Sequence, residues 1–243
     1  MFRFLMTSGF IILFLVLSIP LLLIEWIIGK FNPEWKDRSC QAIVQWAFRC
    51  CAFMAGARTD YIGMENIPKE GSFLYVGNHR SYFDIVLTYL CFPRPTGYVA
   101  KSEMNSIPLL STWMRNIHCL FLDRKNIKEG MKAILRGIEE IKSGISICIF
   151  PEGTRSTTDD FLPFREGSFR MAEKSKCPII PISITNSSAL WEDHMPRMKK
   201  SHVIIEFGKP IVLTELSKED RKFLGAYVQN EIKKMYDKNK KII

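Results

Sequence analysis

From about residue 58 onward, short apolar runs of strand length alternate with longer amphipathic segments. The runs are rich in β-branched and aromatic residues and are bounded by polar turns, glycine or proline, which is typical of β-strands. Several are continuously apolar, as expected for strands buried on both faces of a sheet. The pattern predicts seven strands, at Thr59–Met64, Phe73–Gly77, Gly97–Lys101, Cys119–Leu122, Ile145–Phe150, Ile179–Ile184 and His202–Phe207.

The clearest amphipathic segment lies between the fourth and fifth predicted strands. Asn126 and Glu129 resemble a capping box at its start, and Gly144 closes its end. Its apolar residues recur at helical spacing, at Met131, Ile134, Leu135, Ile138 and Ile141. Because helices alternate with strands in this way, residues 58–243 are predicted to form one α/β domain. Its core would be a mostly parallel sheet of about seven strands flanked by helices.

Residues 1–57 have a different composition. Residues 4–24 are almost wholly apolar, which matches the ~20 residues that cross a bilayer, and no cleavage site typical of a signal peptide follows. Pro20 interrupts the backbone hydrogen bonds, so a kinked or re-entrant helix fits as well as a straight span. A second apolar stretch covers residues 40–57, with basic residues between the two.

These features predict an N-terminal helical hairpin, residues 1–57, that docks in or on one leaflet of a membrane. The basic residues between its two apolar stretches would face anionic headgroups. The alternative is that the second stretch is an ordinary core helix of the α/β domain.

Two residues suited to proton transfer follow the second predicted strand. His79 and Asp84 lie five residues apart where that strand ends, and open α/β sheets bind ligands at the carboxyl ends of their strands. In a continuous helix this spacing leaves the side chains about 140° apart, so they meet only if the chain bends between them. We expect Asp84, in the first turn of the next helix, to hold one ring nitrogen of His79 and leave the other free to accept a proton. The alternative is that each residue only caps a turn or a helix.

A second polar cluster follows the fifth predicted strand and consists of Glu152, Gly153, Thr154 and Arg155. Residues of these types in a turn-prone loop are suited to hold a polyol phosphate, with the Arg155 guanidinium forked onto phosphate oxygens. The alternative is a simple turn followed by an ion pair.

Further strand ends carry related signals. Arg124 follows the fourth predicted strand, Lys101 ends the third, and Pro178 and Pro181 bracket the sixth. In a parallel sheet such ends lie on one edge. The sequence therefore predicts that they meet beside His79.

The charge balance favours an acidic partner, since 34 basic and 25 acidic residues give a net charge of +9. Nucleic acid, an anionic membrane and a phosphorylated substrate all fit this sign. No nucleic-acid motif is evident, and the apolar N-terminus favours a membrane. The seven cysteines have no metal-ligand spacing, so we expect reduced, mostly buried thiols in a cytosolic compartment, no metal and no cofactor.

Taken in order, these segments resemble the motifs of the glycerolipid acyltransferases, specifically the bacterial 1-acyl-sn-glycerol-3-phosphate (lysophosphatidic acid) acyltransferases. The resemblance covers roughly residues 58–210, and the first and third motifs in combination are highly specific. The N-terminal hairpin is similar to the membrane-docking helices of this family. The matching motifs are Asn78-His79-x4-Asp84, Phe121-Leu122-Asp123-Arg124, Phe150-Pro151-Glu152-Gly153-Thr154-Arg155-Ser156 and Pro178-Ile179-Ile180-Pro181.

The resemblance implies transfer of a fatty acyl group from a thioester of coenzyme A or acyl carrier protein to the sn-2 hydroxyl of 1-acyl-glycerol 3-phosphate, giving phosphatidic acid. His79 would be the general base and Asp84 would fix its tautomer, with the substrate as nucleophile and no acyl-enzyme. The partners implied are a lysophospholipid, the acyl thioester and the bilayer. The protein would be membrane-associated, with its active site on the cytoplasmic side.

The other motif residues are expected to bind the acceptor. Arg124 and Arg155, joined by Lys101, would clamp its phosphate. Glu152 and Thr154 would contact the glycerol portion or order the loop.

Donors for the tetrahedral oxyanion are expected among the backbone amides around Gly153 or near Pro178–Pro181. The family usually has glycine where this chain has His118, which leads us to expect a narrower or reshaped loop and a changed acceptor site. The imidazole there would either pack against its surroundings, which we favour, or make a polar contact.

Two other functions remain open from the sequence. The first is a related acyltransferase that acts on glycerol 3-phosphate or on another lysophospholipid. The second is a membrane protein that binds anionic lipid without catalysis. The His79 and Asp84 pair argues against the second, because binding a phosphate requires neither residue.

Overall fold

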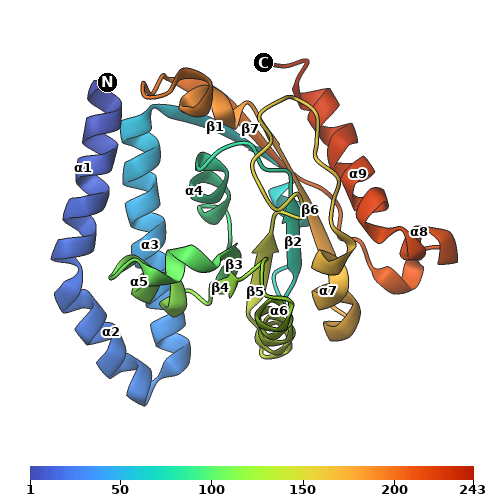
Figure 1. Cartoon of the computed structure of the whole chain (residues 1–243), viewed down its shortest axis with the longest axis horizontal. Coiled ribbons are helices and arrows are strands. Elements are labelled where there is room, and N and C mark those ends of the chain that lie inside the picture. Colours follow the sequence, from blue (N-terminus) through green and yellow to red (C-terminus); the bar gives the residue numbers. More distant parts are fainter.

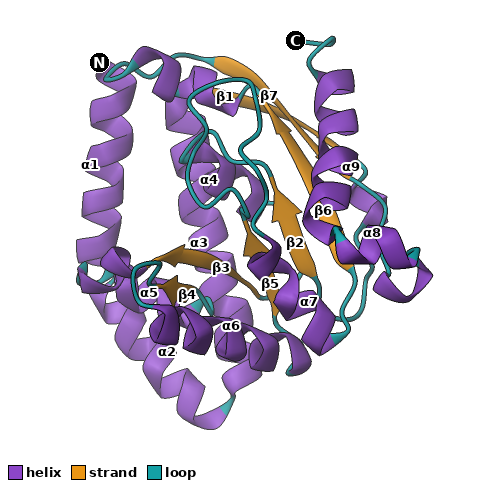
Figure 2. Ribbon diagram, turned by 45° about the vertical axis from the view of Figure 1, so that its right-hand side comes forward, coloured by secondary structure: helices purple, strands orange, loops and turns teal.

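The computed structural model describes the whole chain, residues 1–243, as one seven-stranded sheet between two layers of helices (Figures 1 and 2). Every predicted strand is present, with each end within two residues of its predicted position, which confirms the α/β fold. The strands are β1 (Ala57–Ile62), β2 (Leu74–Gly77), β3 (Thr96–Lys101), β4 (Leu120–Leu122), β5 (Ser146–Ile149), β6 (Ile179–Thr185) and β7 (Ser201–Phe207).

The sheet is mostly parallel, as predicted. Its strand order is β1-β7-β6-β2-β5-β3-β4. The five strands from β6 to β4 run parallel to one another, whereas β7 is antiparallel to β6 and pairs in parallel with β1. The carboxyl ends of five neighbouring strands therefore lie along one edge of the sheet, and their amino ends lie along the other.

Alternate strand residues enter two separate hydrophobic cores, one on each face of the sheet. In β2, Tyr75 packs with α3, α4 and α5, whereas Leu74 and Val76 pack with α6, α7 and α9. Because both faces are covered, β2 is fully buried, which explains its unbroken apolar sequence. The helices of the domain are α4 (Phe83–Tyr89), α5 (Leu110–Asn116), α6 (Ile127–Lys142), α7 (Arg170–Ser175), α8 (Lys218–Lys222) and α9 (Leu224–Asn239).

Helix α6 begins and ends as the sequence predicts. The Asn126 side chain accepts hydrogen bonds from the backbone N–H groups of Lys128 and Glu129, which satisfies two amides of the first turn. Gly144 follows the last turn in a left-handed conformation with φ of 99°.

Three helices precede the sheet, α1 (Phe2–Leu17), α2 (Ile19–Phe31) and α3 (Pro33–Ala55). Helices α1 and α2 meet at an angle of 51°, and the Ser18 hydroxyl at the junction accepts a 2.8 Å hydrogen bond from Trp113 Nε1. Pro20 lies in the first turn of α2, where a missing N–H is tolerated. No single helix is long and apolar enough to cross a membrane, although the bent pair α1 and α2 together has the length and composition to do so.

Helix α3 has two kinds of surface. One side contributes Cys40, Val44 and Ala55 to the core on the α4 face of the sheet, so this side has the character of a core helix. Trp46 and Phe53 on other sides are 53% and 83% exposed. Helices α1 and α2 pack against α3 (Figure 1).

His118 precedes β4 and therefore lies at the amino edge of the sheet, opposite the edge that carries His79. The expectation that it reshapes the acceptor loop is wrong for this reason. Its φ of 59° is left-handed, which accounts for the glycine that we expected at this position. The imidazole is also not held by packing alone: Nδ1 lies 2.8 Å from Glu140 of α6 and Nε2 lies 3.0 Å from Asp37 of α3.

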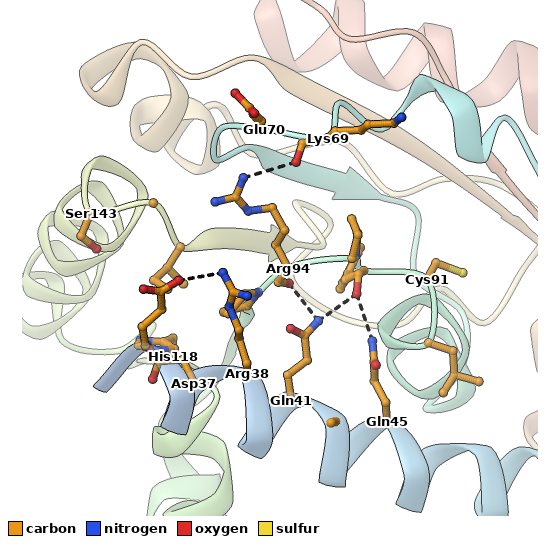
Figure 3. A pocket seen from close by; sticks show the side chains of 18 residues that line it. Asp37, Arg38, Gln41, Gln45, Lys69, Glu70, Cys91, Arg94, His118 and Ser143 are labelled. Atoms are coloured by element: carbon orange, nitrogen blue, oxygen red, sulfur yellow. Dashed lines mark hydrogen bonds and ion pairs between the residues drawn. The ribbon is translucent and has the colours of Figure 1, made fainter. Parts of the chain in front are cut away.

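Figure 3 shows the polar groove of about 1060 Å³ in which His118 takes part. Helix α3 lines one side of the groove, and the other side includes segments that lead into strands: Lys69 and Glu70 come before β2, Arg94 before β3 and Ser143 before β5. This groove is thus on the amino edge, away from the strand ends that carry the motifs.

The ion pairs of His118 predict a pH-dependent contribution to stability. Although burial alone would lower it, Asp37 and Glu140 raise the pKa of His118 to about 9, above its ordinary value of about 6.5. The stabilisation is fully present below pH ~6.5 and is lost as the pH rises through about 9, and a shift of this size corresponds to about 3 kcal/mol of unfolding free energy.

His118→Gln should therefore lower the melting temperature at pH 6 and have a much smaller effect at pH 10. Thermal unfolding of both proteins at these two pH values measures this difference. Arg136 also contacts Glu140, at 3.4 Å. An equal loss of melting temperature at both pH values would contradict the assignment.

Candidate active site

The buried side chain of Asn78 fixes the point where the chain leaves β2. Its amide Nδ2 donates to the Ile184 carbonyl at 2.9 Å, and its Oδ1 accepts from the Ile184 N–H at 2.8 Å. The side chain thus extends the hydrogen bonding between β2 and β6 by one position. The residue that follows, His79, consequently leaves the sheet in a defined direction.

His79 and Asp84 meet as the sequence predicts. The chain bends after His79, Asp84 lies in the first turn of α4, and His79 Nδ1 is 2.8 Å from Asp84 Oδ2. Because a carboxylate accepts hydrogen bonds, this contact places the ring proton on Nδ1 and leaves the lone pair of Nε2 free. The ring stacks on Phe150 with a centroid distance of 4.3 Å, and 15% of the His79 side chain is exposed.

The loop between His79 and α4 is held by carboxylates. Asp84 Oδ2 also accepts from the N–H groups of Arg80 at 2.7 Å and Ser81 at 2.8 Å. The remaining amides bind elsewhere: His79 N–H to Glu152 at 2.7 Å, Tyr82 N–H to Glu192 at 2.8 Å, and Phe83 N–H to the Ser81 hydroxyl at 3.0 Å. Every backbone N–H from His79 to Phe83 therefore has a protein acceptor, so none is left to stabilise an oxyanion.

Glu152 organises two loops from the end of β5. Only 3% of the residue is exposed, and its second oxygen accepts from the Leu162 N–H at 3.0 Å. Burial raises the pKa of its carboxyl above the ordinary value, opposed by the hydrogen bonds from the Leu162 and His79 amides. Both carboxylate oxygens are occupied, so of the two roles expected for Glu152 the contacts support the ordering of the loop.

Two arginines lie close together beside Gly153. The Arg124 guanidinium donates to the Gly153 carbonyl. A Cβ atom on Gly153 would lie 3.2 Å from Arg165 Nε and 3.6 Å from Arg124 Cζ. Burial and the neighbouring Arg165 charge lower the pKa of Arg124 below its ordinary value. Neither arginine forms an ion pair with a carboxylate, so both guanidinium groups remain available to bind an anion.

Arg165 was not identified from the sequence. It lies in the irregular segment between β5 and α7, and no strand end or helical periodicity marks it. The structure brings it to the site because its backbone N–H donates to the Pro151 carbonyl at 3.2 Å.

The other predicted binding residues differ in whether they already contact protein groups. Lys101 and Thr154 are exposed. Arg155 Nη1 lies 3.0 Å from Glu192 Oε1, and its guanidinium carbon lies 3.8 Å from the centre of the Tyr82 ring. Arg155 is thus paired with a carboxylate, whereas Arg124 and Arg165 are not.

The proline-bracketed segment of β6 does not reach this edge, so that prediction is wrong. β6 is parallel to β2, and Pro178 lies at its amino end, where the Pro178 carbonyl accepts from the Leu74 N–H at 3.1 Å. The Ile179 N–H donates to Ile211, so oxyanion donors are not available here. The carboxyl end of β6 is Thr185, and the segment after it carries Glu192.

The two cysteines in the central apolar segments, Cys119 and Cys148, are poorly suited to act as nucleophiles. Burial raises the pKa of Cys119 to about 12 and that of Cys148 further above its ordinary value. All seven cysteines are free thiols. No group of three or more His, Cys, Asp or Glu side chains is arranged to hold a metal ion.

A partly exposed imidazole, a buried carboxylate behind it and two arginines without a carboxylate partner on the same edge of the sheet are suited to proton transfer from a negatively charged substrate. Comparison with known proteins gives the class of reaction. The family model described as Acyltransferase matches residues 58–185. The chain belongs to this acyltransferase family.

Named relatives agree with this assignment. The 1-acyl-sn-glycerol-3-phosphate acyltransferase of Saccharomyces cerevisiae is 30% identical over 210 residues, which cover 83% of this chain and 68% of the relative. The enzyme of the same name from Borreliella burgdorferi is 28% identical over 197 residues, 81% of this chain and 76% of the relative. The crystal structure of the 1-acyl-sn-glycerophosphate (LPA) acyltransferase from Thermotoga maritima superposes with a TM-score of 0.83 at 24% identity, over 98% of this chain and 95% of that one.

Proposed function

We propose that the protein transfers a fatty acyl group from an acyl thioester to the sn-2 hydroxyl of 1-acyl-glycerol 3-phosphate, giving phosphatidic acid in phospholipid biosynthesis. The donor would be acyl-coenzyme A or acyl carrier protein. The observation that carries the proposal is the pairing of His79 Nδ1 with the buried Asp84. It leaves Nε2 as a base on the same edge of the sheet as the unpaired Arg124 and Arg165. The names of the relatives support the choice of acceptor.

In the proposed reaction, His79 Nε2 removes the proton from the acceptor hydroxyl as its oxygen attacks the thioester carbonyl. Asp84 stabilises the imidazolium that forms. The tetrahedral intermediate then collapses with cleavage of the carbon–sulfur bond, and the thiol leaves with the proton that His79 carried. The backbone N–H groups of Thr154 and Arg155 have no protein acceptor and are our candidates for stabilising the oxyanion.

The acceptor phosphate is proposed to bind between Arg124 and Arg165, with Lys101 contributing charge from the end of β3. The glycine at position 153 is consistent with this site, because a Cβ there would make a tight contact with Arg165 Nε at 3.2 Å and would touch Arg124 Cζ at 3.6 Å. Its φ of 78° also favours glycine. Arg155 borders the same loop, and Thr154 is exposed next to it.

We also propose that α1 and α2 dock on the cytoplasmic face of a membrane, so that a lipid acceptor reaches the site from the bilayer. Support comes from the large apolar side chains that these helices expose, which no other part of the protein covers. They include Phe2 at 75%, Leu17 at 65%, Trp26 at 57% and Phe31 at 84% exposure.

Replacing the base tests the proposed chemistry. His79→Ala should lower kcat by about 10²–10⁴-fold, the usual contribution of a general base, and leave the melting temperature and liposome binding near those of wild type. The assay is acyl transfer from both thioester donors to 1-acyl-glycerol 3-phosphate, glycerol 3-phosphate and a lysophospholipid with a larger head group.

The acceptor panel separates the related activities. A wild-type preference for glycerol 3-phosphate would replace the proposed acceptor, and binding of lipid without thiol release would favour a non-catalytic protein. Retention of more than a few per cent of transfer by His79→Ala would remove His79 as the base.

The phosphate site predicts a separable effect on binding. Arg124→Ala and Arg165→Ala should each raise KM for the acceptor by about 10–100-fold, the loss expected for a charged hydrogen bond of 1.5–3 kcal/mol. KM for the thioester should stay the same. Arg170→Ala, an exposed arginine of α7 outside the site, is the matched control. An unchanged acceptor KM in both variants would place the phosphate elsewhere.

Membrane docking through α2 predicts a loss of liposome binding in the double variant Trp26→Ser and Phe31→Ser. The variant lacks two aromatic side chains that would insert into the membrane. Its affinity for anionic vesicles, measured by co-sedimentation, should therefore fall at least about tenfold. Leu135→Ser on α6, where Leu135 is 52% exposed, is the control and should bind as wild type does. Equal binding by all three proteins would exclude α2 as the docking surface.

A further inference from the structure

Glu192 touches both motif loops of the site, although it lies beyond the residues that match the family model. It is in a short 3₁₀ turn (Glu192–His194) that follows the carboxyl end of β6. Its side chain is 13% exposed. Oε2 accepts from the Ser81 hydroxyl at 2.7 Å, and Oε1 accepts from the Tyr82 N–H at 2.8 Å.

These bonds fix the chain immediately before Asp84. A hydroxyl has one proton to donate, and that of Ser81 goes to Glu192, which leaves its oxygen to accept from the Phe83 N–H at 3.0 Å. Ser81 is fully buried. Without Glu192, the Ser81 hydroxyl and the Tyr82 amide would lose their acceptor at the point where α4 begins.

Glu192 also reaches the loop after β5 through Arg155, at 3.0 Å from Oε1. The next residue, Ser156, donates its N–H to the His79 carbonyl at 2.8 Å. The Arg155 guanidinium is confined further by the Tyr82 ring on which it lies. The carboxylate therefore joins the segment that carries His79 and Asp84 to the segment that carries Arg155.

We propose that Glu192 is a positioning residue for the His79–Asp84 pair, and that Arg155 acts through Glu192 to hold the two loops together. The expected change in kcat rests on the proposed function. Arg155 was expected to clamp the acceptor phosphate. The acceptor phosphate is instead left to Arg124 and Arg165, which form no ion pair with a carboxylate.

The kinetic test compares Glu192→Gln, Glu192→Ala, Arg155→Ala and the double variant Glu192→Ala and Arg155→Ala. A glutamine keeps an acceptor for the Tyr82 N–H but loses the charge that holds Arg155. We therefore expect kcat to fall at least about tenfold in Glu192→Ala and less in Glu192→Gln, with the acceptor KM within about twofold of wild type. The double variant should be no slower than the slower single variant, because the two residues act as one unit.

Asp193→Asn is the matched control, since Asp193 lies in the same turn and its side chain contacts Ser188 instead of the motif loops. It should retain wild-type kcat. A rise in acceptor KM with unchanged kcat in Arg155→Ala would return Arg155 to the phosphate site and overturn the inference. Additive losses in the double variant would overturn it as well.

A spectroscopic readout separates this inference from the proposed function. The Nδ1 proton of His79, hydrogen-bonded to Asp84, should give a downfield proton resonance in histidine-labelled protein, assigned by its loss in His79→Ala. The resonance should shift or broaden in Glu192→Ala and stay in place in Asp193→Asn, whether or not the chosen acceptor is a substrate. An unmoved resonance in a folded Glu192→Ala variant would contradict the positioning role even if the enzyme transfers acyl groups as proposed.

Discussion

The site depends on one buried carboxylate. Asp84 is fully buried, and a charge in that position is tolerated only when donors surround it. Three donors reach its Oδ2: the His79 ring and the N–H groups of Arg80 and Ser81. The two amides oblige the chain to wrap around the carboxylate between β2 and α4, and this wrapping carries the imidazole back onto its partner. The same contacts that satisfy the Asp84 carboxylate oxygen therefore orient the base.

Acidic and basic side chains around Asp84 have separate positions: the acidic ones bind the loop backbone, and the basic ones lie at Gly153. Glu152 and Glu192 bind the backbone beside His79 from two other strand ends, so three acidic groups hold the loop from different sides. The basic pair Arg124 and Arg165 lies at Gly153, with no carboxylate partner. Acidic side chains thus provide the framework, and the unpaired basic side chains are left for an anionic substrate. Trp191 extends this framework towards the N-terminal helices, because its ring lies 5.5 Å from Phe4 of α1 and 5.6 Å from Tyr82.

The sequence was sufficient for the strands and for the meeting of His79 with Asp84, because hydrophobic periodicity and the rule for parallel strand ends are both local signals. It failed where the outcome depends on direction or on distant contacts. The prolines correctly indicated the strand β6, but they lie near its amino end and not at the edge that carries His79. His118 was assigned to the acceptor loop, whereas its place before β4 puts it on the opposite edge, between Asp37 and Glu140. Arg165 and Glu192 lie in irregular segments whose positions are fixed by long-range hydrogen bonds, and no periodicity reveals such contacts.

The central claim is that the acceptor hydroxyl, activated by His79, attacks the thioester directly. Rapid-quench measurement of thiol release by purified wild-type protein, with acyl-coenzyme A and with acyl carrier protein thioester, each in the presence and absence of 1-acyl-glycerol 3-phosphate, tests it most directly. Direct transfer predicts no rapid release of thiol without acceptor and one phosphatidic acid per thiol with it. A burst of one thiol per enzyme in the absence of acceptor, with the acyl group bound to the protein, would contradict the claim.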